Sequence, residues 1–389
     1  MFDLKAVKII TIVCWLITAL AIAGLAIWFM TGTLFGQRAG TRSVDWNFSG
    51  LNIGALERLT GPYEVDGVYN VETAGINSLN IDWVAGGITV KPHDGNEIRI
   101  TEYAQRALAN DEKLHYTISG GTLTVKYREH NVGISLSVLN KRLEVLVPRE
   151  LCENLNRFSV DSISGGIDVS DVNAVAFTVS TTSGGANLSG IVSQTFSADT
   201  MSGSITVTSV GTYDMNIDST SGSVTVARVQ ANNMSFNGMS GSVRISDSSA
   251  DTLDIDTTSG SINASGDFNN VKLSSMSGRL SLDNSAPRSV LNADTTSGSL
   301  QFSGSFDRVN IDSMSGSLTI RSAIVPSHLK ADTTSGDINI YVPNEGAVSV
   351  HHSSTSGRFS SDIPVTIQNR DAQFVLSSMS GNARIFVMN

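Results

Sequence analysis

The chain has 389 residues, a formal net charge of −10, 16% charged and 6% aromatic side chains, and 35 glycines. Low charge with abundant Ser, Thr, Gly and β-branched residues argues against a disordered chain or a helical bundle, and favours an all-β protein with many turns. The acidic balance argues against nucleic acid as a partner, because few Lys and Arg are available to neutralise phosphates.

An apolar N-terminal segment predicts a membrane anchor. Residues 9–30 are uncharged and mostly apolar, and at about 1.5 Å per residue they reach about 33 Å, enough to cross a bilayer. We expect a cytoplasmic tail at 1–8, a transmembrane helix at 9–35 and the C-terminal bulk outside the cell, as a single-pass protein of the cell membrane. The alternative is a signal peptide cleaved at Ala19-Leu20-Ala21.

The two cysteines are not expected to form a disulfide. Cys14 lies within the apolar segment and Cys152 far beyond it, so the two thiols should lie in different compartments. Leucines and a phenylalanine surround Cys152 in the sequence, which predicts a buried, inert thiol.

Two less regular sections follow the anchor. Residues 36–75 have weak periodicity and are expected to form a linker and a cap. Residues 76–150 form an irregular first β section, in which alternating apolar residues flank Gly86 and Gly121. Alternation with period two is typical of strands with one buried face.

A Ser-Gly repeat dominates residues 151–389. The interval between successive glycines is 18 to 24 residues and most often 19. Apolar residues stand seven and five positions before each glycine, and two and four after it, which predicts two short strands joined at a corner. We expect glycine at this corner because the bend needs a positive φ, and serine because its hydroxyl can bond locally to the turned backbone or form a ladder with its copies in neighbouring coils. The glycines are Gly165, Gly184, Gly203, Gly222, Gly241, Gly260, Gly278, Gly298, Gly316, Gly336, Gly357 and Gly381.

Such units bury their apolar side only by stacking, so the sequence predicts a β-solenoid, or β-helix, of about 19-residue strand-corner-strand units. A 38-residue super-period lies above the first, because the residue two before each glycine alternates between Thr and Met from Thr182 to Thr334. Either one coil holds two units or successive coils alternate, and both arrangements remain open. The methionines are expected to fill the corners rather than bind a ligand. Wider final spacings, with Pro343 and Pro364, suggest a C-terminal cap.

Three stretches carry a family resemblance: "LNIDWVAGGITVKPHDGNEIRI", "LEVLVP" and the serial "SGxI/L/V" strand pairs. Together with the single N-terminal span, they make residues 76–389 similar to the bacterial putative-adhesin family of β-strand-repeat proteins, a domain of unknown function. The resemblance implies a solenoid fold, a cell-envelope location and no established enzymatic activity. Membrane-anchored relatives are associated with envelope-stress systems.

No residue stands out as catalytic. A serine nucleophile needs one distinguished Ser with a base, whereas this Ser occurs twelve times and histidine is missing from nearly every unit. The pair His351-His352 has no Cys or further His nearby, so a defect at the C-terminal end is preferred to a metal site. Solenoid enzymes that cleave acidic polysaccharide use clustered Asp, Arg and Lys, but Lys and Arg are scattered here.

The position four before the glycine is acidic in seven of the twelve units. These side chains should point outward, and carboxylates stacked about 5 Å apart would repel one another, which could favour bound Ca²⁺. Solvated carboxylates with hydrogen bonds from Ser or Thr are the simpler interpretation. The seven are Asp161, which is not a calcium candidate, and the calcium candidates Asp199, Asp218, Asp256, Asp294, Asp312 and Asp332.

The sequence therefore predicts a non-enzymatic, membrane-anchored extracellular β-solenoid without a cofactor, acting as an adhesin-like or structural interaction surface. Its partners would be the membrane, through the N-terminal helix, and cell-wall glycan or an envelope protein. The alternative is an envelope-stress accessory protein that binds a membrane regulator. A polysaccharide-active β-helix enzyme is the third possibility.

Overall fold

The computed structural model describes residues 62–129, 139–367 and 373–388. These residues lie in one compact unit, Leu59–Asn389. The predicted tail at 1–8, the span at 9–35 and the linker up to residue 61 lie outside the described residues. Within the described ranges, no helix has the length and hydropathy that crossing a membrane requires.

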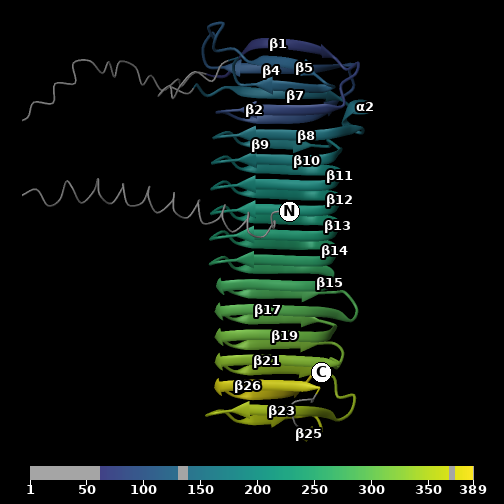
Figure 1. The fold of residues 1–389 in the computed structure, drawn as a ribbon, viewed down its shortest axis with the longest axis vertical. Helices are drawn as coiled ribbons and strands as arrows, with labels where there is room; N and C mark the ends of the chain where they lie inside the picture. The colour runs from purple at the N-terminus through teal and green to yellow at the C-terminus, as the bar shows by residue number, and fades with distance from the viewer. Residues whose placement is uncertain (1–61, 130–138, 368–372, 389) are drawn as a thin grey trace, which may run out of the picture. The chain divides into compact units, whose positions relative to one another are not determined.

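The described chain is an all-β solenoid whose coils stack along one axis (Figure 1). Strands of successive coils pair in parallel, and each residue lies beside the residue about 19 positions later: Ala186 beside Ile205, and Phe196 beside Met215. One 19-residue unit is therefore one coil, and Thr and Met units alternate from coil to coil. The strands of the regular coils are β8 (Leu155–Ser162), β9 (Ile167–Ser170), β10 (Ala174–Thr181), β11 (Ala186–Thr200), β12 (Ile205–Ser219), β13 (Val224–Gly238), β14 (Val243–Thr257), β15 (Ile262–Ser277), β16 (Leu280–Asn284), β17 (Ser289–Ser297), β18 (Leu300–Gly304), β19 (Phe306–Ser315), β20 (Leu318–Ser322), β21 (His328–Ser335) and β22 (Ile338–Val342).

The core is a set of columns that run along the stack, since equivalent inward positions of successive coils lie one above the other. Phe158, Phe177 and Phe196 form one such column, with ring centroids 4.9 and 5.2 Å apart and nearly parallel planes. Met215 and Met234 continue it, both buried. The predicted inward positions before and after the glycine are confirmed, because alternation with period two places these side chains on the core side of both strands.

The corner glycines form a column of their own. A Cβ added to any of the twelve repeat glycines would lie 1.7 to 2.4 Å from the carbonyl oxygen of the glycine in the adjacent coil. Coils approach too closely here for any side chain. From Gly165 to Gly260 none of these glycines has a positive φ, whereas Gly278 and Gly298, at 157° and 149°, do. The predicted reason for glycine, a positive φ, is thus wrong for the first half of the array, where close approach of two backbones is the cause.

At the N-terminal end, the order of the coils along the stack differs from their order in the sequence. Strands β2 and β3 form a regular coil with Gly86 at its corner, and this coil lies between the β6–β7 coil and the β8–β9 coil. Strands β5 and β6 form an antiparallel hairpin at Gly121, so Gly121 is a turn residue and not a member of the glycine column. The elements are β1 (Glu64–Glu72), β2 (Ser78–Trp83), β3 (Ile88–His93), β4 (Glu97–Ala104), β5 (His115–Ser119), β6 (Thr122–Lys126), β7 (Arg142–Pro148) and α2 (Arg149–Cys152).

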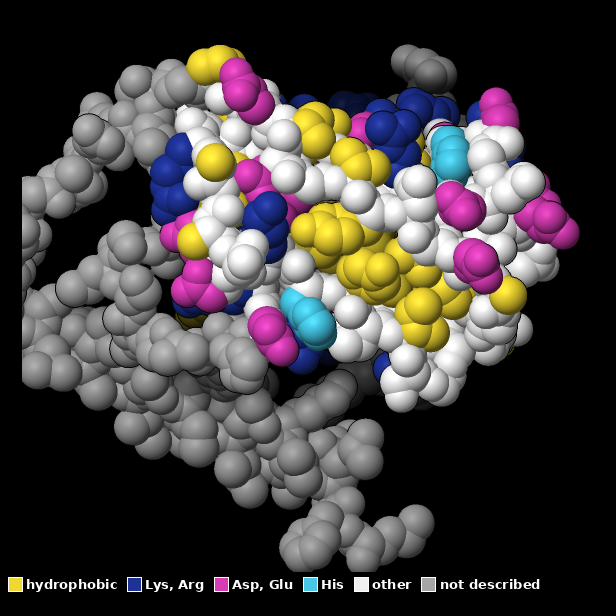
Figure 2. Space-filling view, turned by 90° about the horizontal axis from the view of Figure 1, so that it is seen from above, with side chains coloured by type: hydrophobic (Ala, Val, Ile, Leu, Met, Phe, Trp, Pro, Cys, Tyr) yellow, Lys and Arg dark blue, Asp and Glu magenta, His cyan; other side chains and the backbone are white. Residues whose placement is uncertain are grey.

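Strands β1 and β4 cover the end of the stack. Strand β1 pairs antiparallel with β4, which pairs antiparallel with β7. Seen end-on from the β1 side, hydrophobic side chains gather on this face (Figure 2), and the exposed large apolar residues of β1 and β5 are Val65, Val68 and Ile118. Below this end, Cys152 of α2 is buried, which confirms the prediction, and burial raises its pKa to about 12.

The C-terminal end repeats the same departure from chain order. The last coil in sequence, β26–β27, lies between the β21–β22 coil and the β23–β24 coil. The glycine column accordingly runs from Gly336 to Gly381 and then to Gly357. The strands are β23 (Val348–Ser354), β24 (Phe359–Ser361), β25 (Val365–Ile367), β26 (Phe374–Ser380) and β27 (Ala383–Val387).

Candidate functional site

The outward residues beside the glycine column form two rows along the stack. The first, which we call the aspartate row, is the position four before each corner glycine, and strand pairing places its members side by side. In spatial order it contains Asp82, Asp161, Ser180, Asp199, Asp218, Asn237, Asp256, Ser274, Asp294, Asp312, Asp332, Ser377 and Ser353.

Five of the six calcium candidates have an acidic neighbour in the adjacent coil. Asp199 lies beside Asp218, and Asp294, Asp312 and Asp332 are consecutive. Asp256, in contrast, lies between Asn237 and Ser274. The sequence alone could not separate these cases, because spacing does not show which units are neighbours.

Neighbouring groups partly compensate the stacked charges. Asn237 Nδ2 donates to Asp218 Oδ1 at 2.7 Å, and Asn216 Nδ2 donates to Asp218 Oδ2 at 2.8 Å. Lys330 Nζ lies 2.8 Å from Asp332 Oδ2 and 3.6 Å from Asp312 Oδ1. A cation bound between Asp312 and Asp332 would have to displace this ammonium.

The calcium hypothesis stays a prediction. No group of three or more His, Cys, Asp or Glu side chains within the described ranges is arranged to hold a metal ion. If the aspartate row does bind Ca²⁺, millimolar calcium should raise the melting temperature, and the rise should shrink in Asp312→Asn. An unchanged melting temperature at millimolar calcium would remove the hypothesis.

Asp199 carries the largest resolved pKa shift in the row. Burial, and then the charge of Asp218, raise its pKa to about 6. A carboxyl whose pKa is raised by folding binds protons more tightly in the native state, so native stability is greatest below the unfolded pKa and falls as pH rises from about 4 to about 6.

We therefore expect Asp199→Asn to stabilise the protein at pH 7, by about 1 kcal/mol once solvent screening of this partly exposed group is allowed for. The row already accommodates an amide at Asn237. Guanidinium unfolding at pH 4 and pH 7 measures the effect: the loss of stability between the two should be smaller in the variant. A gain at pH 4 as large as that at pH 7 would contradict this origin.

The second row, the methionine row, is the position two before each corner glycine from Gly184 onward. Its methionine side chains are 46 to 61% exposed, so the prediction that they fill the corner is wrong. Because side chains alternate along a strand, this position lies on the outward side and the methionines point to solvent. In spatial order the row contains Thr182, Met201, Thr220, Met239, Thr258, Met276, Thr296, Met314, Thr334, Met379 and Thr355.

Thr and Met alternate in the spatial order of the coils, even where they do not alternate in the sequence. In sequence Thr355 follows Thr334 and the pattern breaks, but the inserted coil places Met379 between them. Successive methionines are two coils, or about 10 Å, apart. That separation is too large for two thioethers to bind one metal ion, so the row presents apolar ridges at regular intervals.

Exposure should control oxidation of the methionines. We expect dilute hydrogen peroxide to convert Met201, Met239, Met276, Met314 and Met379 to sulfoxides at least about tenfold faster than the buried Met215 and Met234. Peptide mass spectrometry of the folded protein measures both groups in one sample, and denatured protein is the control in which the difference should disappear. Equal rates in the folded state would show that the methionine row is covered.

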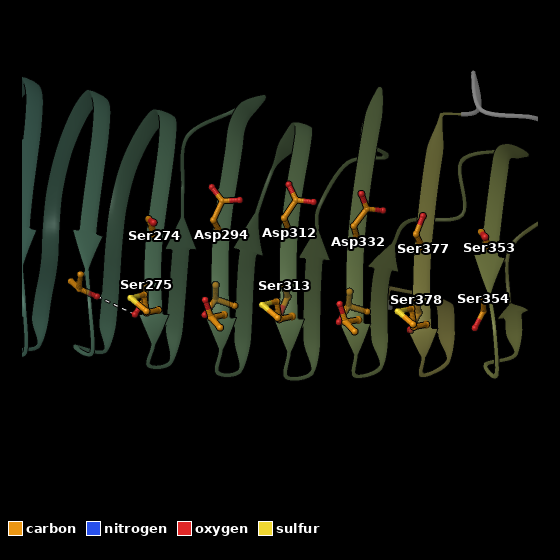
Figure 3. A pocket seen from close by; sticks show the side chains of 18 of the residues that line it. Ser274, Ser275, Asp294, Asp312, Ser313, Asp332, Ser353, Ser354, Ser377 and Ser378 are labelled. Carbon is orange, nitrogen blue, oxygen red and sulfur yellow. Dashed lines mark hydrogen bonds between the residues drawn. The ribbon is translucent and has the colours of Figure 1, made fainter. Parts of the chain in front are cut away.

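The two rows border a groove of about 720 Å³ in the C-terminal half of the stack. Asp294, Asp312 and Asp332 project from successive strands along it, and Ser274, Ser377 and Ser353 continue their line (Figure 3). The exposed methionines of the groove are Met276, Met314 and Met379. The groove thus combines carboxylates with an apolar ridge over several coils.

The corner serines donate hydrogen bonds to backbone carbonyls. Ser183 Oγ donates to the carbonyl of Ile163 at 3.1 Å, and Ser221 Oγ donates to the carbonyl of Met201 at 3.3 Å, each in the adjacent coil. The acceptor is a backbone carbonyl of the neighbouring coil and not the equivalent serine, so the predicted ladder of serine copies is wrong for these two serines. Such a hydroxyl has its proton engaged by a carbonyl and not by a general base.

His352 occupies an inward register position beside Leu376, as predicted. Its ring stacks on Phe359 with centroids 5.4 Å apart. Burial, and then the charge of His351, lower its pKa, which favours the neutral ring. His352 thus packs as an aromatic filler at the end of the stack.

A family model matches most of the chain. The family described as Toastrack DUF4097 matches residues 76–222, 208–266 and 266–387. No curated protein sequence matches the chain.

Several solved structures are similar in part. A putative lipid binding protein from Parabacteroides distasonis ATCC 8503 is 12% identical, covers 65% of this chain and 98% of its own, and has a TM-score of 0.43. A putative adhesin from the same organism is 11% identical, with coverage of 84% and 98% and a TM-score of 0.30. A putative cell adhesion protein from Clostridium sporogenes ATCC 15579 is 10% identical, with coverage of 84% and 100% and a TM-score of 0.21. Since the family match extends over most of the described solenoid, the chain belongs to the Toastrack DUF4097 family.

Proposed function

We propose that the protein is a non-enzymatic, membrane-anchored extracellular scaffold that binds an extended partner along its outer face, in the manner of an adhesin. The observation that supports this is the repetition of the face: aspartates recur at the same outward position in consecutive coils, as at Asp294, Asp312 and Asp332, and exposed methionines recur in every second coil.

A repeated face suits a repeated ligand. Adjacent coils are about 4.8 Å apart, so an extended polymer would meet similar groups at each step. Each contact is weak, but contacts made by one connected chain act together and raise the overall affinity. Cell-wall glycan and an extended envelope protein both have this form, and the predicted span at 9–35 would hold the solenoid near either one.

The test uses full-length protein, purified in mild detergent, immobilised and exposed to wall fractions and membrane extracts. We expect retention of wall polymer, reduced in the triple variant Met239→Lys, Met276→Lys, Met314→Lys. The matched control carries Thr206→Lys, Thr225→Lys and Thr319→Lys, which are outward positions on the strands that follow the corner. If no wall component is retained, or if both triple variants bind equally, the proposal fails.

A variant lacking residues 1–35 separates this proposal from the regulatory alternative. Adhesion should survive the deletion, because the solenoid carries the binding face. Retention of only a membrane protein, and its loss upon deletion, would favour an envelope-stress partner instead.

A further inference from the structure

A second hollow, of about 700 Å³, lies near the N-terminal end of the solenoid, where the residue after the corner glycine changes from Ser to Gly. We call it the corner trough. In later coils this position is Ser204, Ser223 or Ser242, but in the first coils it is Gly87, Gly166 and Gly185. Gly87 and Gly166 line the trough.

Backbone and packing do not require these two glycines. Neither has a positive φ. A Cβ built on Gly87 or Gly166 would come no closer than 4.0 or 3.9 Å to another residue, in contrast to the corner column. The missing side chains therefore leave open space over the floor of the trough.

Arg142 stands at one end of this glycine floor. Strand pairing places Leu143 beside Ile88 and Ile88 beside Ile167, so Arg142, Gly87 and Gly166 occupy one row of adjacent strands. The Arg142 guanidinium lies over the Tyr63 ring, 4.2 Å from its centroid, and no carboxylate within the described ranges forms an ion pair with it. A guanidinium held on an aromatic face keeps its N–H donors available for an anionic oxygen.

A polar row borders the floor. Glu144, Thr89 and Asp168 lie side by side on β7, β3 and β9. Lys91 Nζ contacts Glu144 Oε1 at 2.8 Å, and Tyr103 Oη donates to Glu144 Oε2 at 3.1 Å. Asn187 Nδ2 donates to Asp168 Oδ1 at 2.7 Å. The carboxylates are thereby held in place as hydrogen-bond acceptors.

We propose that the corner trough binds a short saccharide that carries a carboxylate: the carboxylate lies on the Arg142 guanidinium, and ring hydroxyls donate to Glu144 and Asp168 above the glycine floor. The choice of a glycan rests on the proposed function. From Arg142 to Gly166 the floor spans two strand spacings, or about 10 Å, which suits a short oligosaccharide. The hydrogen bond and charge of Lys91 hold the pKa of Glu144 below its usual range, which favours a binding carboxylate over a general acid.

The test measures binding of an alginate hexamer, made of uronate sugars, to the full-length protein by isothermal titration calorimetry, with neutral maltohexaose beside it. We expect alginate to bind and maltohexaose to bind at least about tenfold more weakly. Arg142→Gln and Gly166→Leu should each weaken alginate binding at least about tenfold. The matched control, Ser223→Leu, places the same side chain at the same coil position outside the trough and should bind like the wild type.

Gly166→Ser is a second variant that should fold normally, since serine occupies this position in other coils. Its affinity for alginate should lie between those of the wild type and Gly166→Leu. Absence of alginate binding, or equal binding by Gly166→Leu and Ser223→Leu, would overturn the trough. Equal affinity for maltohexaose would overturn the role of Arg142. Retention of wall polymer by Gly166→Leu, together with no alginate binding to the wild type, would reject the trough and leave the proposed function standing.

Discussion

Gly222→Ala is expected to destabilise the solenoid by at least about 3 kcal/mol, at or beyond the upper end of ordinary overpacking penalties. An added Cβ at this position would lie 1.7 Å from the carbonyl oxygen of Gly203 and 2.5 Å from its carbon. Both obstacles are backbone atoms that belong to the hydrogen-bonded coil next to it. Relief requires the two coils to separate, which would break the bonds that join β12 to β13.

The matched control is Gly211→Ala, in the same strand β12. A Cβ there meets nothing within 4 Å, so loss of backbone freedom in the unfolded chain should make this substitution neutral or stabilising by up to about 1 kcal/mol. Guanidinium unfolding followed by circular dichroism compares the two variants. Hydrogen exchange shows whether the Gly222→Ala defect opens the neighbouring coils first, as nearest-neighbour coupling in a solenoid predicts. Equal midpoints for the two variants would refute the close approach of the coils.

Lys141→Met is expected to cost about 3–5 kcal/mol, the range for breaking a buried ion pair. Lys141 and Glu102 are both fully buried, with Nζ 2.6 Å from Glu102 Oε1. The ammonium also donates to the carbonyls of Glu112 and Tyr127 and lies 4.0 Å from the centroid of the Tyr127 ring. Removing the lysine leaves the Glu102 carboxylate buried without a cation.

The double variant Lys141→Met, Glu102→Leu should recover most of the loss, because it removes the uncompensated charge together with its partner. Lys272→Met is the surface control: Lys272 Nζ lies 3.1 Å from Asp254 Oδ2, both side chains are largely exposed, and the expected loss is below about 1 kcal/mol. Thermal and chemical unfolding measure all three. A double variant no more stable than Lys141→Met would show that packing of the lysine stem, and not its charge, holds this end of the solenoid.

Much of the fold could be predicted because the same pattern of apolar and polar residues recurs in every repeat unit. Phe177, Phe196 and Met215 alternate with polar neighbours in the same register in successive units, and only stacked coils bury all of them. The family resemblance was also readable from these stretches. The exposure of Met239 and Met276 was not predicted, although their even distance from the glycine places them on the outward side of the strand that precedes it.

Two signals in the sequence became meaningful only in the structure. The alternation of Thr and Met breaks at Thr355 because the chain leaves room for one coil after β21–β22. The later β26–β27 coil, which contains Met379, occupies that place. The doubled glycines at Gly86-Gly87 and Gly165-Gly166 mark the corner trough. Neither can be interpreted without knowing which coils are neighbours.

The sequence by itself determined the solenoid class, the two strands of each unit and the inward residues, because side-chain alternation within one strand is a local property. The tertiary structure decided the order of coils at both ends, the reason for the corner glycines and the neighbours of each aspartate. These depend on contacts between segments at least 18 residues apart, where backbone approach and charge pairing are set by stacking.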